Sequence, residues 1–336
     1  METVEYGGVM VFAEQNEGAP HRVCFELLAK GRELADTLGA ELSCAMLAGK
    51  GENADALSAR GANKIYLIED ETRFSQPDEP AYAECLAGLI KKAKPGIVLF
   101  GATPFGRSLA PRVAALLGAG LTADCTALET DPSDGRLVQI RPAFSGNILA
   151  RIKSSALPQM ATVRHKEFDE AAADTSKKSE IIRISGGAFI NNGNAPAFEF
   201  IRRLADKRTE ITDAEVVVSG GAGLKKASDF GMIKELAALL GGSAGASRAI
   251  VENGFVPKEY QVGYSGSRVK PKIYVAAGIS GSPQHMAGMK DSETVVAING
   301  DASAPIFKIA DVGIVGDLYE VVPKLIKLVT ELKNEK

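Results

Sequence analysis

The stretch Ala214-Glu-Val-Val-Val-Ser-Gly-Gly-Ala-Gly223 decides the fold class of the second half of the chain. Its run of valines is short, apolar and β-branched, as expected for a parallel strand that is covered on both faces. A glycine turn follows, and a helix with apolar residues at three- and four-residue spacing begins near Ser228. A glycine turn that opens a helix suits an anion, because glycines allow close backbone approach and the helix end offers free N–H groups. The strict G-x-G-x-x-G fingerprint fails at its third glycine, so this turn alone identifies no ligand.

Four further turns of this kind follow, each after a short apolar run. They read G-A-S-R (245–248), Q-V-G-Y-S-G (261–266), G-I-S-G-S-P-Q-H (278–285) and I-N-G-D (298–301). In open parallel sheets, ligands bind beyond the carboxyl ends of the strands, where such turns lie. Turns this rich in backbone donors and hydroxyls suit a long ligand that carries phosphates. The second half is therefore predicted to bind a dinucleotide.

Individual side chains in these turns are candidate ligands. Pro283 suits the first position of a helix, which places His285 in the first turn of that helix. A lone histidine is usually structural, but at a helix start among glycine turns it is also a candidate to contact a ligand. Ser265 lies between two glycines, where its hydroxyl can reach a heteroatom. Asn299 and Asp317 each stand at the carboxyl end of a predicted strand, where they can bind a ribose or an adenine.

The first half, residues 1 to about 165, alternates strands and helices. The predicted strands are 8–13, 41–48, 64–68 and 96–100, and the predicted helices are 22–38, 53–60, 81–94 and 109–117. This alternation predicts a second parallel sheet. Asp131-Pro-Ser-Asp-Gly marks a turn between two further strands.

The turn Gly101-Ala-Thr-Pro-Phe-Gly-Arg107, at a helix N-terminus, has two readings. Its glycines, hydroxyl and arginine can hold an anion. Equally, it is a tight strand-to-helix turn with Arg107 solvated or paired, since it matches no strict phosphate-loop signature.

Residues 166 to about 213 have the composition of a connection between domains: a charged, alanine-rich start, one strand-like run and a cluster of glycines and asparagines. The predicted domains are 1–194 and 195–336, with the linker at about 166–213.

Composition excludes several classes of protein. With 336 residues, 45% hydrophobic and 24% charged, the chain is typical of soluble globular proteins, and a net charge of -3 gives no reason to expect nucleic acid. We expect a cytoplasmic protein, because the start has no signal-peptide pattern and no long apolar run occurs. The cysteines, Cys24, Cys44, Cys85 and Cys125, lack metal or redox spacing and are predicted to be buried, reduced thiols. With only 3 histidines, which are far apart in the sequence, no metal site is expected.

Taken together, these motifs resemble the α subunit of electron transfer flavoproteins. The motifs S-G-G-x-G-L-K, G-A-S-R, Q-V-G-x-S-G, G-I-S-G-x-x-Q-H-x-A-G-M, V-A-I-N and A-P-I-F-x-I-A-D-x-G-I-V-x-D-L stand in family order between Val217 and Leu318. The first half adds Gly101-Ala-Thr, Arg107-Ser-Leu-Ala-Pro-Arg, Gly120-Leu-Thr-Ala-Asp-Cys and Arg141-Pro-Ala-Phe. The resemblance thus covers nearly the whole chain.

The resemblance implies an α/β fold with an N-terminal nucleotide-binding-like domain, which packs on a β subunit, and a C-terminal Rossmann-like domain, which holds one FAD. AMP or a second FAD is then expected in the β subunit. The implied FAD contacts are Gly221, Gly223, Ser247, Arg248, Gln261, Val262, Gly263, Tyr264, Ser265, Ser280, Gly281, Ser282, Pro283, Gln284, His285, Asn299, Asp317 and Leu318. None of them needs to act as an acid or base. Ser247 and the turn from Ser280 to His285 would contact the pyrophosphate and flavin side. Val262 to Ser265 would lie along the ring, with the Ser265 hydroxyl on N5.

The remaining contacts concern charge and the adenosine end. Asn299, Asp317 and Leu318 would hold adenosine, and Arg248 would place its guanidinium near the ring. Because reduced flavin carries negative charge, Arg248, His285 and a helix N-terminus are expected to stabilise it. The chain departs from the family pattern at Ala222, usually arginine, and at Tyr264, usually glutamine. Loss of that arginine is expected to cost about 1.5–3 kcal/mol of charge-assisted hydrogen bonding unless Lys225 or Lys226 replaces it.

Three functions are open at this stage. The first is an electron carrier of one of two types: a shuttle from acyl-CoA dehydrogenases to a membrane-linked acceptor, or a bifurcating protein that splits NADH electrons between an acyl-CoA reductase and ferredoxin or flavodoxin. The second is a nicotinamide-dependent dehydrogenase, but the acid expected about 20 residues after the glycine turn is missing, since that region reads Leu240-Gly-Gly-Ser-Ala. The third is a nucleotide-binding scaffold without catalysis. The two departures lean towards the bifurcating type.

Overall fold

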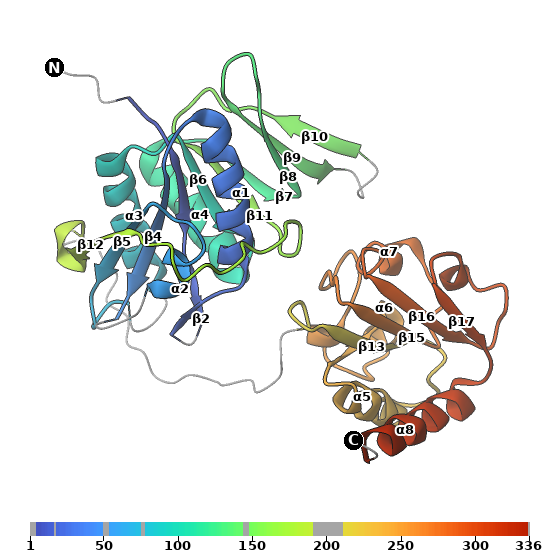
Figure 1. The fold of residues 1–336 in the computed structure, drawn as a ribbon. Helices are drawn as coiled ribbons and strands as arrows, with labels where there is room; N and C mark the ends of the chain where they lie inside the picture. Colours follow the sequence, from blue (N-terminus) through green and yellow to red (C-terminus); the bar gives the residue numbers. More distant parts are fainter. Residues whose placement is uncertain are drawn as a thin grey trace. The chain divides into compact units, whose positions relative to one another are not determined.

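The computed structural model describes residues 5–16, 18–49, 54–74, 78–143, 148–190 and 211–334. The chain divides into two compact units, Met1–Phe200 and Ile201–Lys336. Each unit is built on its own parallel sheet (Figure 1). The predicted boundary between residues 194 and 195 lies outside the described residues. Among the described residues, no helix is long and apolar enough to cross a membrane.

The first unit is an α/β domain around a 7-stranded parallel sheet in the order β12-β5-β4-β1-β6-β11-β7. The strands of this sheet are β1 (Val9–Phe12), β4 (Leu42–Ala48), β5 (Lys64–Glu69), β6 (Ile97–Gly101), β7 (Leu121–Cys125), β11 (Gln159–Val163) and β12 (Glu180–Ser185). Its helices are α1 (Val23–Leu38), α2 (Asp55–Ser58), α3 (Glu79–Ala93) and α4 (Pro104–Leu117), and a two-stranded hairpin joins β2 (Gln15–Asn16) to β3 (Ala19–Pro20). Two separate apolar cores, one with α1 and α2 and one with α3 and α4, lie against the sheet. The parallel sheet predicted for this half is confirmed.

The helix ends follow local capping chemistry. Helix α1 ends at Gly39, in the left-handed conformation that glycine tolerates (φ 61°), as the sequence predicts. Helix α4 begins at Pro104, five residues before the predicted start at Leu109, because Thr103 accepts a hydrogen bond from the Gly106 N–H and proline suits the first helical position.

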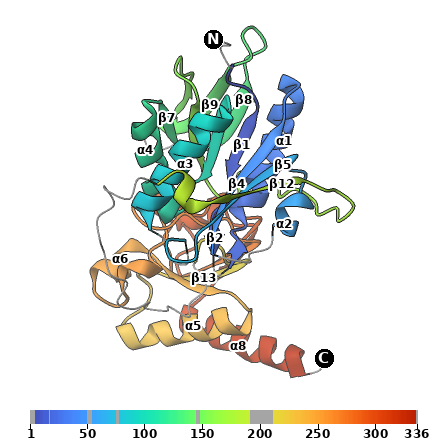
Figure 2. The same cartoon turned by 90° about the vertical axis from the view of Figure 1, so that its left-hand side faces the viewer.

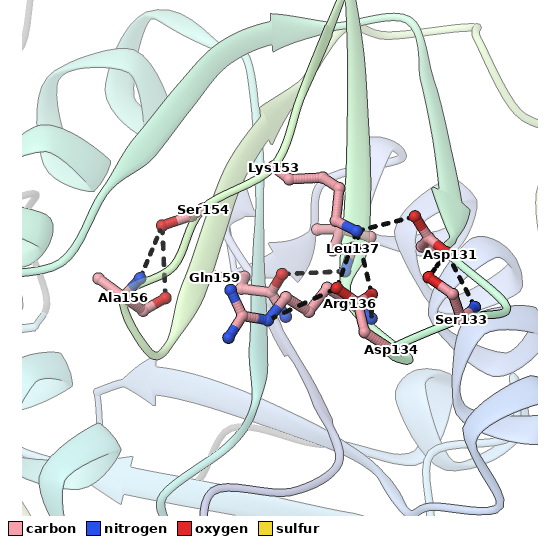
Figure 3. A network of polar contacts seen from close by, with 9 residues as sticks. All are labelled: Asp131, Ser133, Asp134, Arg136, Leu137, Lys153, Ser154, Ala156 and Gln159. Carbon is pink, nitrogen blue, oxygen red and sulfur yellow. Dashed lines mark hydrogen bonds and ion pairs between the residues drawn. The ribbon is translucent and has the colours of Figure 1, made fainter.

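A small antiparallel sheet formed by β8 (Ala127–Thr130), β9 (Leu137–Ala143) and β10 (Ile148–Ile152) extends from the first unit (Figure 2). The predicted turn at Asp131–Gly135 joins β8 to β9. Lys153 closes it, with its Nζ atom 2.8 Å from carboxylate oxygens of both Asp131 and Asp134 (Figure 3). The Gln159 side chain accepts a hydrogen bond of 2.9 Å from the Leu137 N–H, which ties this small sheet to the parallel one.

The first part of the predicted linker, residues 166–190, instead belongs to the first unit. The Lys166 N–H donates to the Glu26 carboxylate (2.7 Å), and the Ala171 N–H donates to the Phe25 carbonyl (3.0 Å). Strand β12 then pairs in parallel with β5, and a 3-10 turn, η2 (Gly186–Ala188), follows. This part of the predicted linker is thus held within the first unit, to which the predicted domain 1–194 also assigned it.

The second unit is a doubly wound α/β domain with a 5-stranded parallel sheet in the order β14-β13-β15-β16-β17. The strands are β13 (Val216–Gly220), β14 (Ser243–Ala246), β15 (Ile273–Ala277), β16 (Thr294–Asn299) and β17 (Val312–Val315). The helices are α5 (Phe230–Leu239), α6 (Arg248–Glu252), α7 (Pro283–Met286) and α8 (Leu318–Asn334), with 3-10 turns η3 (Ala227–Asp229), η4 (Lys258–Tyr260) and η5 (Pro305–Lys308). Helices α5 and α8 pack side by side (Figure 1).

The strand order fixes where a ligand binds. The chain runs from β13 outward to β14 and then crosses to β15 on the other side of β13. Such a reversal opens a crevice at the carboxyl ends of the two strands. The crevice between β13 and β15 lies where the S-G-G-A-G and G-I-S-G turns leave the sheet.

Candidate functional site

Two glycine turns meet backbone to backbone at the crevice between β13 and β15. The Gly221 N–H donates to the Ala277 carbonyl (2.9 Å), and the Gly223 N–H donates to the Gly278 carbonyl (3.0 Å). A Cβ atom on Gly221 would lie 2.4 Å from the Gly278 oxygen, and one on Gly278 would lie 2.6 Å from a methyl of Leu318. Both glycines are therefore needed for this close approach.

A pocket of about 510 Å³ opens beside these turns. It is lined by Ala222, Gly223, Gly278, Ser280, Asn299, Gly300, Gly316, Asp317 and Leu318. These residues follow β13, β15, β16 and β17, so four strands contribute their carboxyl ends. The structure thus brings together five predicted site residues, Gly223, Ser280, Asn299, Asp317 and Leu318.

Asn299 and Asp317 also shape the pocket wall. The Asn299 side chain donates to the Ile279 carbonyl (2.9 Å) and accepts from the Asp301 N–H (2.9 Å), which joins the turns after β15 and β16. Asp317 accepts a hydrogen bond from the Tyr319 N–H (2.9 Å) and caps α8.

The other predicted residues form a second group around α7. The Tyr264 N–H donates to the Gln284 carbonyl (2.8 Å), so the turn 261–265 lies on the start of that helix. The Ser265 hydroxyl accepts a hydrogen bond from the Gln261 side chain (2.9 Å) and keeps its own proton to donate. Gly263 approaches the helix closely, because a Cβ atom there would lie 3.1 Å from the Gln284 oxygen.

The turn before α7 depends on Gly281, Ser282 and Pro283. Gly281 has φ 88°, and a Cβ atom there would lie 2.4 Å from the Ile306 nitrogen. Ser282 caps α7 through the His285 N–H, and Pro283 takes the first helical position as predicted. This turn joins the two groups of site residues. It begins at Ser280, in the pocket wall, and ends at α7, on which the turn 261–265 lies.

His285 is buried, with 4% of its surface exposed. Its Nε2 atom lies 3.0 Å from the Tyr274 hydroxyl. Burial lowers the pKa of His285 to about 4, against a smaller opposing effect from the Val262 backbone. Burial therefore favours the neutral imidazole at pH 7, which can contact an anion through a ring N–H rather than through a positive charge.

Ser247 and Arg248 stand at the start of α6. The Ser247 hydroxyl is buried and, among the described residues, has no hydrogen-bond partner. Such an orphaned group is typical of a ligand contact. Arg248 instead pairs with Glu252 one turn along α6, at 2.8 Å and with 62% of its side chain exposed.

Neither candidate lysine replaces the missing arginine at Ala222. The Lys225 ammonium lies over the Tyr319 ring (4.7 Å), and that of Lys226 lies 3.9 Å from Asp229. Among the described residues that line the pocket there is a carboxylate, Asp317, and no lysine or arginine.

The other residues that the sequence singled out belong to the first unit. Arg107 pairs with Asp124 at 3.1 Å, which favours the structural reading of the turn at 101–107. His165, which follows a strand and was expected at the surface rather than in a site, is half-buried, and its ring packs edge-on against His21. All four cysteines are free and buried, as predicted, and burial raises the pKa of Cys44, Cys85 and Cys125 to about 12.

Both units match models of one protein family. Residues 9–187 match the electron transfer flavoprotein domain, and residues 210–290 match the electron transfer flavoprotein FAD-binding domain. The chain belongs to the electron transfer flavoprotein family. The resemblance drawn from the motifs is thereby confirmed, as is electron transfer as the function class. The FAD-binding model spans four of the five glycine turns, including the whole of the 278–285 turn.

Named relatives agree with this assignment. Protein FixB of Clostridium saccharobutylicum is 42% identical over 333 residues, covering 99% of both chains. The electron transfer flavoprotein subunit alpha of Thermoanaerobacterium thermosaccharolyticum is 42% identical over 332 residues, covering 98% of this chain and 99% of its own. The lactate dehydrogenase (NAD(+),ferredoxin) subunit LctC of Acetobacterium woodii is 41% identical over 336 residues, covering 98% of this chain and 79% of its own.

The site of this electron transfer flavoprotein fits FAD. Among the described residues, the buried Ser247 hydroxyl has no hydrogen-bond partner, so a ligand atom can bond to it. The glycines of the crevice have no side chains to fill it, which leaves the backbone of the turns open to a ligand. Sequence reasoning missed Tyr274 and Ser219, which lie within apolar strands, and Gly316. The only signal for Tyr274 was a hydroxyl in a strand that is otherwise fully apolar.

Proposed function

We propose that this chain carries one FAD in its second unit and serves as the α subunit of a heterodimeric electron transfer flavoprotein. Bound FAD accepts and returns electrons one or two at a time. The observation that carries the proposal is the glycine-lined pocket at the β13–β15 crevice, within a domain that matches the family's FAD-binding model.

In this proposal the two groups of site residues bind opposite ends of the cofactor. Asn299, Asp317 and Leu318 bind the adenosine end, and Ser247 with the turn from Ser280 to His285 binds the pyrophosphate and flavin side. The turn from Gln261 to Ser265 lies along the ring, with the Ser265 proton free to donate. Support comes from the pocket lining and from the packing of this turn on α7.

Arg248 supplies the positive charge near the ring in this proposal. Its pair with Glu252 is exposed on both sides, at 62% and 59%. Such a pair contributes about 0–1 kcal/mol, so the guanidinium leaves it at little cost. Neutral His285 then contributes hydrogen bonding and packing rather than charge.

The first unit, in this proposal, packs on a β subunit that holds AMP or a second FAD. Electrons pass from a flavoprotein such as an acyl-CoA dehydrogenase to another carrier. The similarity to a subunit whose name includes NAD(+) and ferredoxin favours a second candidate, the bifurcating type, in which NADH electrons are split between an acyl-CoA reductase and ferredoxin or flavodoxin. We infer that the protein acts in the cytoplasm.

The test is to co-purify the chain with its β subunit, release the cofactors and count FAD and AMP. One FAD with one AMP supports the simple shuttle, and two FAD without AMP supports bifurcation. A heterodimer without flavin contradicts the proposed function.

A further inference from the structure

A buried tyrosine contacts the one histidine of the site. Tyr274 lies in β15 with 0% of its surface exposed, and its hydroxyl is 3.0 Å from His285 Nε2. The contact therefore joins β15 to helix α7. Its direction decides which nitrogen of His285 carries the proton.

The surroundings of the imidazole favour one direction. Nδ1 is buried and makes no well-aligned hydrogen bond within the described part of the chain, but the Val262 backbone lies close enough to raise the pKa of the ring. A backbone group that favours the protonated ring is a carbonyl, which only accepts. A neutral ring beside it therefore carries its proton on Nδ1. Nε2 is then left with a lone pair that needs a donor.

Tyr274 is suited to be that donor. Burial raises the pKa of its hydroxyl well above the ordinary value, so the hydroxyl keeps its proton. A phenol hydroxyl carries one proton to donate, and the Nε2 atom of His285 is the hydrogen-bond partner of Tyr274 among the described residues.

We propose that Tyr274 is a positioning residue of the flavin site: its hydroxyl donates to Nε2 of His285 and holds the imidazole in the tautomer with its proton on Nδ1. The proposal rests on the proposed FAD site for its functional meaning, but the tautomer is a property of this chain alone. The hydrogen bond from Tyr274 to His285 links strand β15 to helix α7, on which the turn along the flavin ring lies.

Gly245, in the neighbouring strand β14, makes room for the residues around this contact. A Cβ atom there would lie 2.2 Å from the Ser219 hydroxyl oxygen and 3.1 Å from a methyl of Val262. The glycine of the G-A-S-R motif thus lets Ser219 and Val262 pack closely in this region. Because Tyr274 and His285 lie on separate elements, the tautomer reports whether β15 and α7 are assembled.

The test is nitrogen NMR on the full chain labelled with ¹⁵N-histidine. The chain has 3 histidines, so the His21→Gln/His165→Gln variant assigns the His285 signals. In the wild type we expect a protonated Nδ1 and an unprotonated Nε2 near neutral pH. In Tyr274→Phe the Nε2 shift moves, because its donor is gone, and the tautomer with a proton on Nε2 gains population. Tyr82→Phe removes a buried tyrosine hydroxyl from the first unit and is the control, with His285 signals unchanged.

A wild-type His285 with its proton on Nε2, or signals that Tyr274→Phe leaves unchanged, overturns the proposal. The wild-type spectrum decides the first point without any variant. In the heterodimer, we expect Tyr274→Phe to weaken FAD binding by about 2- to 15-fold, the equivalent of one hydrogen bond, and to shift the flavin reduction potential. If wild type binds no FAD, the proposed function fails while the histidine spectrum still decides the tautomer. If FAD binds and neither affinity nor potential responds to Tyr274→Phe, the positioning role is refuted.

Discussion

Gly221→Ala is expected to separate the two turns of the FAD site. The added Cβ atom would lie 2.4 Å from the Gly278 oxygen and 2.6 Å from a side-chain carbon of Ile279. Ordinary contacts need about 1 Å more, so the turn after β13 has to move away from the turn after β15. That movement strains the 2.9 Å bond from the Gly221 N–H and the 3.0 Å bond from the Gly223 N–H.

The expected magnitude follows from overpacking. Forcing one extra methyl into a close-packed contact costs about 1–3 kcal/mol. The second unit should therefore unfold more easily by that amount, measured by chemical denaturation of the full chain. FAD affinity of the heterodimer should fall by about 5- to 150-fold if the same strain opposes the bound geometry, measured by fluorescence titration of the flavin.

Gly231→Ala is the matched control, because it makes the same change in the same unit. Gly231 lies in α5, and a Cβ atom there meets nothing within 4 Å. Replacing a helical glycine with alanine is expected to stabilise the unit by up to about 1 kcal/mol and to leave FAD affinity unchanged. If Gly221→Ala matches this control in both measurements, the close approach of the two turns is not what forms the site.

Three further predictions address charge and shape. Ala222→Arg should strengthen FAD binding by about 1.5–3 kcal/mol, because it places a cation in a pocket wall that has none among its described residues. Ala238→Arg on α5 adds the same charge outside the pocket and is the control. The pKa of His285 in the folded state is about 4, below its unfolded value, so as the pH falls the unfolded state binds the proton first. The free energy of unfolding of the second unit should therefore fall by about 2 kcal/mol between pH 7 and pH 5. His285→Gln should remove much of that fall, measured in denaturation curves at the two pH values. Glu26 in the first unit has the opposite sign: burial raises its pKa to about 7, so its ionisation destabilises the folded state as the pH rises, and Glu26→Gln should stabilise the first unit more at pH 8 than at pH 5.5. Equal effects of Glu26→Gln at the two pH values would count against an ionisable, buried carboxyl there.

Much of the fold could be predicted because strand and turn chemistry is local. The valines of β13, the glycine turn after it and the apolar face of α5 lie within one stretch, and their spacing specifies strand, turn and helix. The five-strand order follows only after the strands pair, so the sequence indicated a parallel sheet but not which crevice is the switch point.

Side-chain partners were harder to predict, because they depend on contacts distant in sequence. His285 was placed at a helix start as expected, but its neutral state depends on burial, and its hydrogen-bond partner is Tyr274, eleven residues earlier in another element. Arg248 pairs with Glu252 four residues later. Helical spacing allows such a pair, but it does not show whether the arginine forms it or binds another group. Residues 166–190 join the first sheet because β12 matches β5 in register, which composition does not reveal.

The central claim is that FAD binds at the carboxyl edge of the second sheet, and hydrogen exchange of the heterodimer tests it most directly. Exchange is compared between the FAD-loaded protein and the protein from which FAD has been removed, with mass spectrometry resolving short peptides. The account predicts protection on FAD binding in peptides that contain residues 220–224, 278–285, 298–301 and 316–319. Protection at the turn 101–107 of the first unit instead, or none in the second unit, would contradict it.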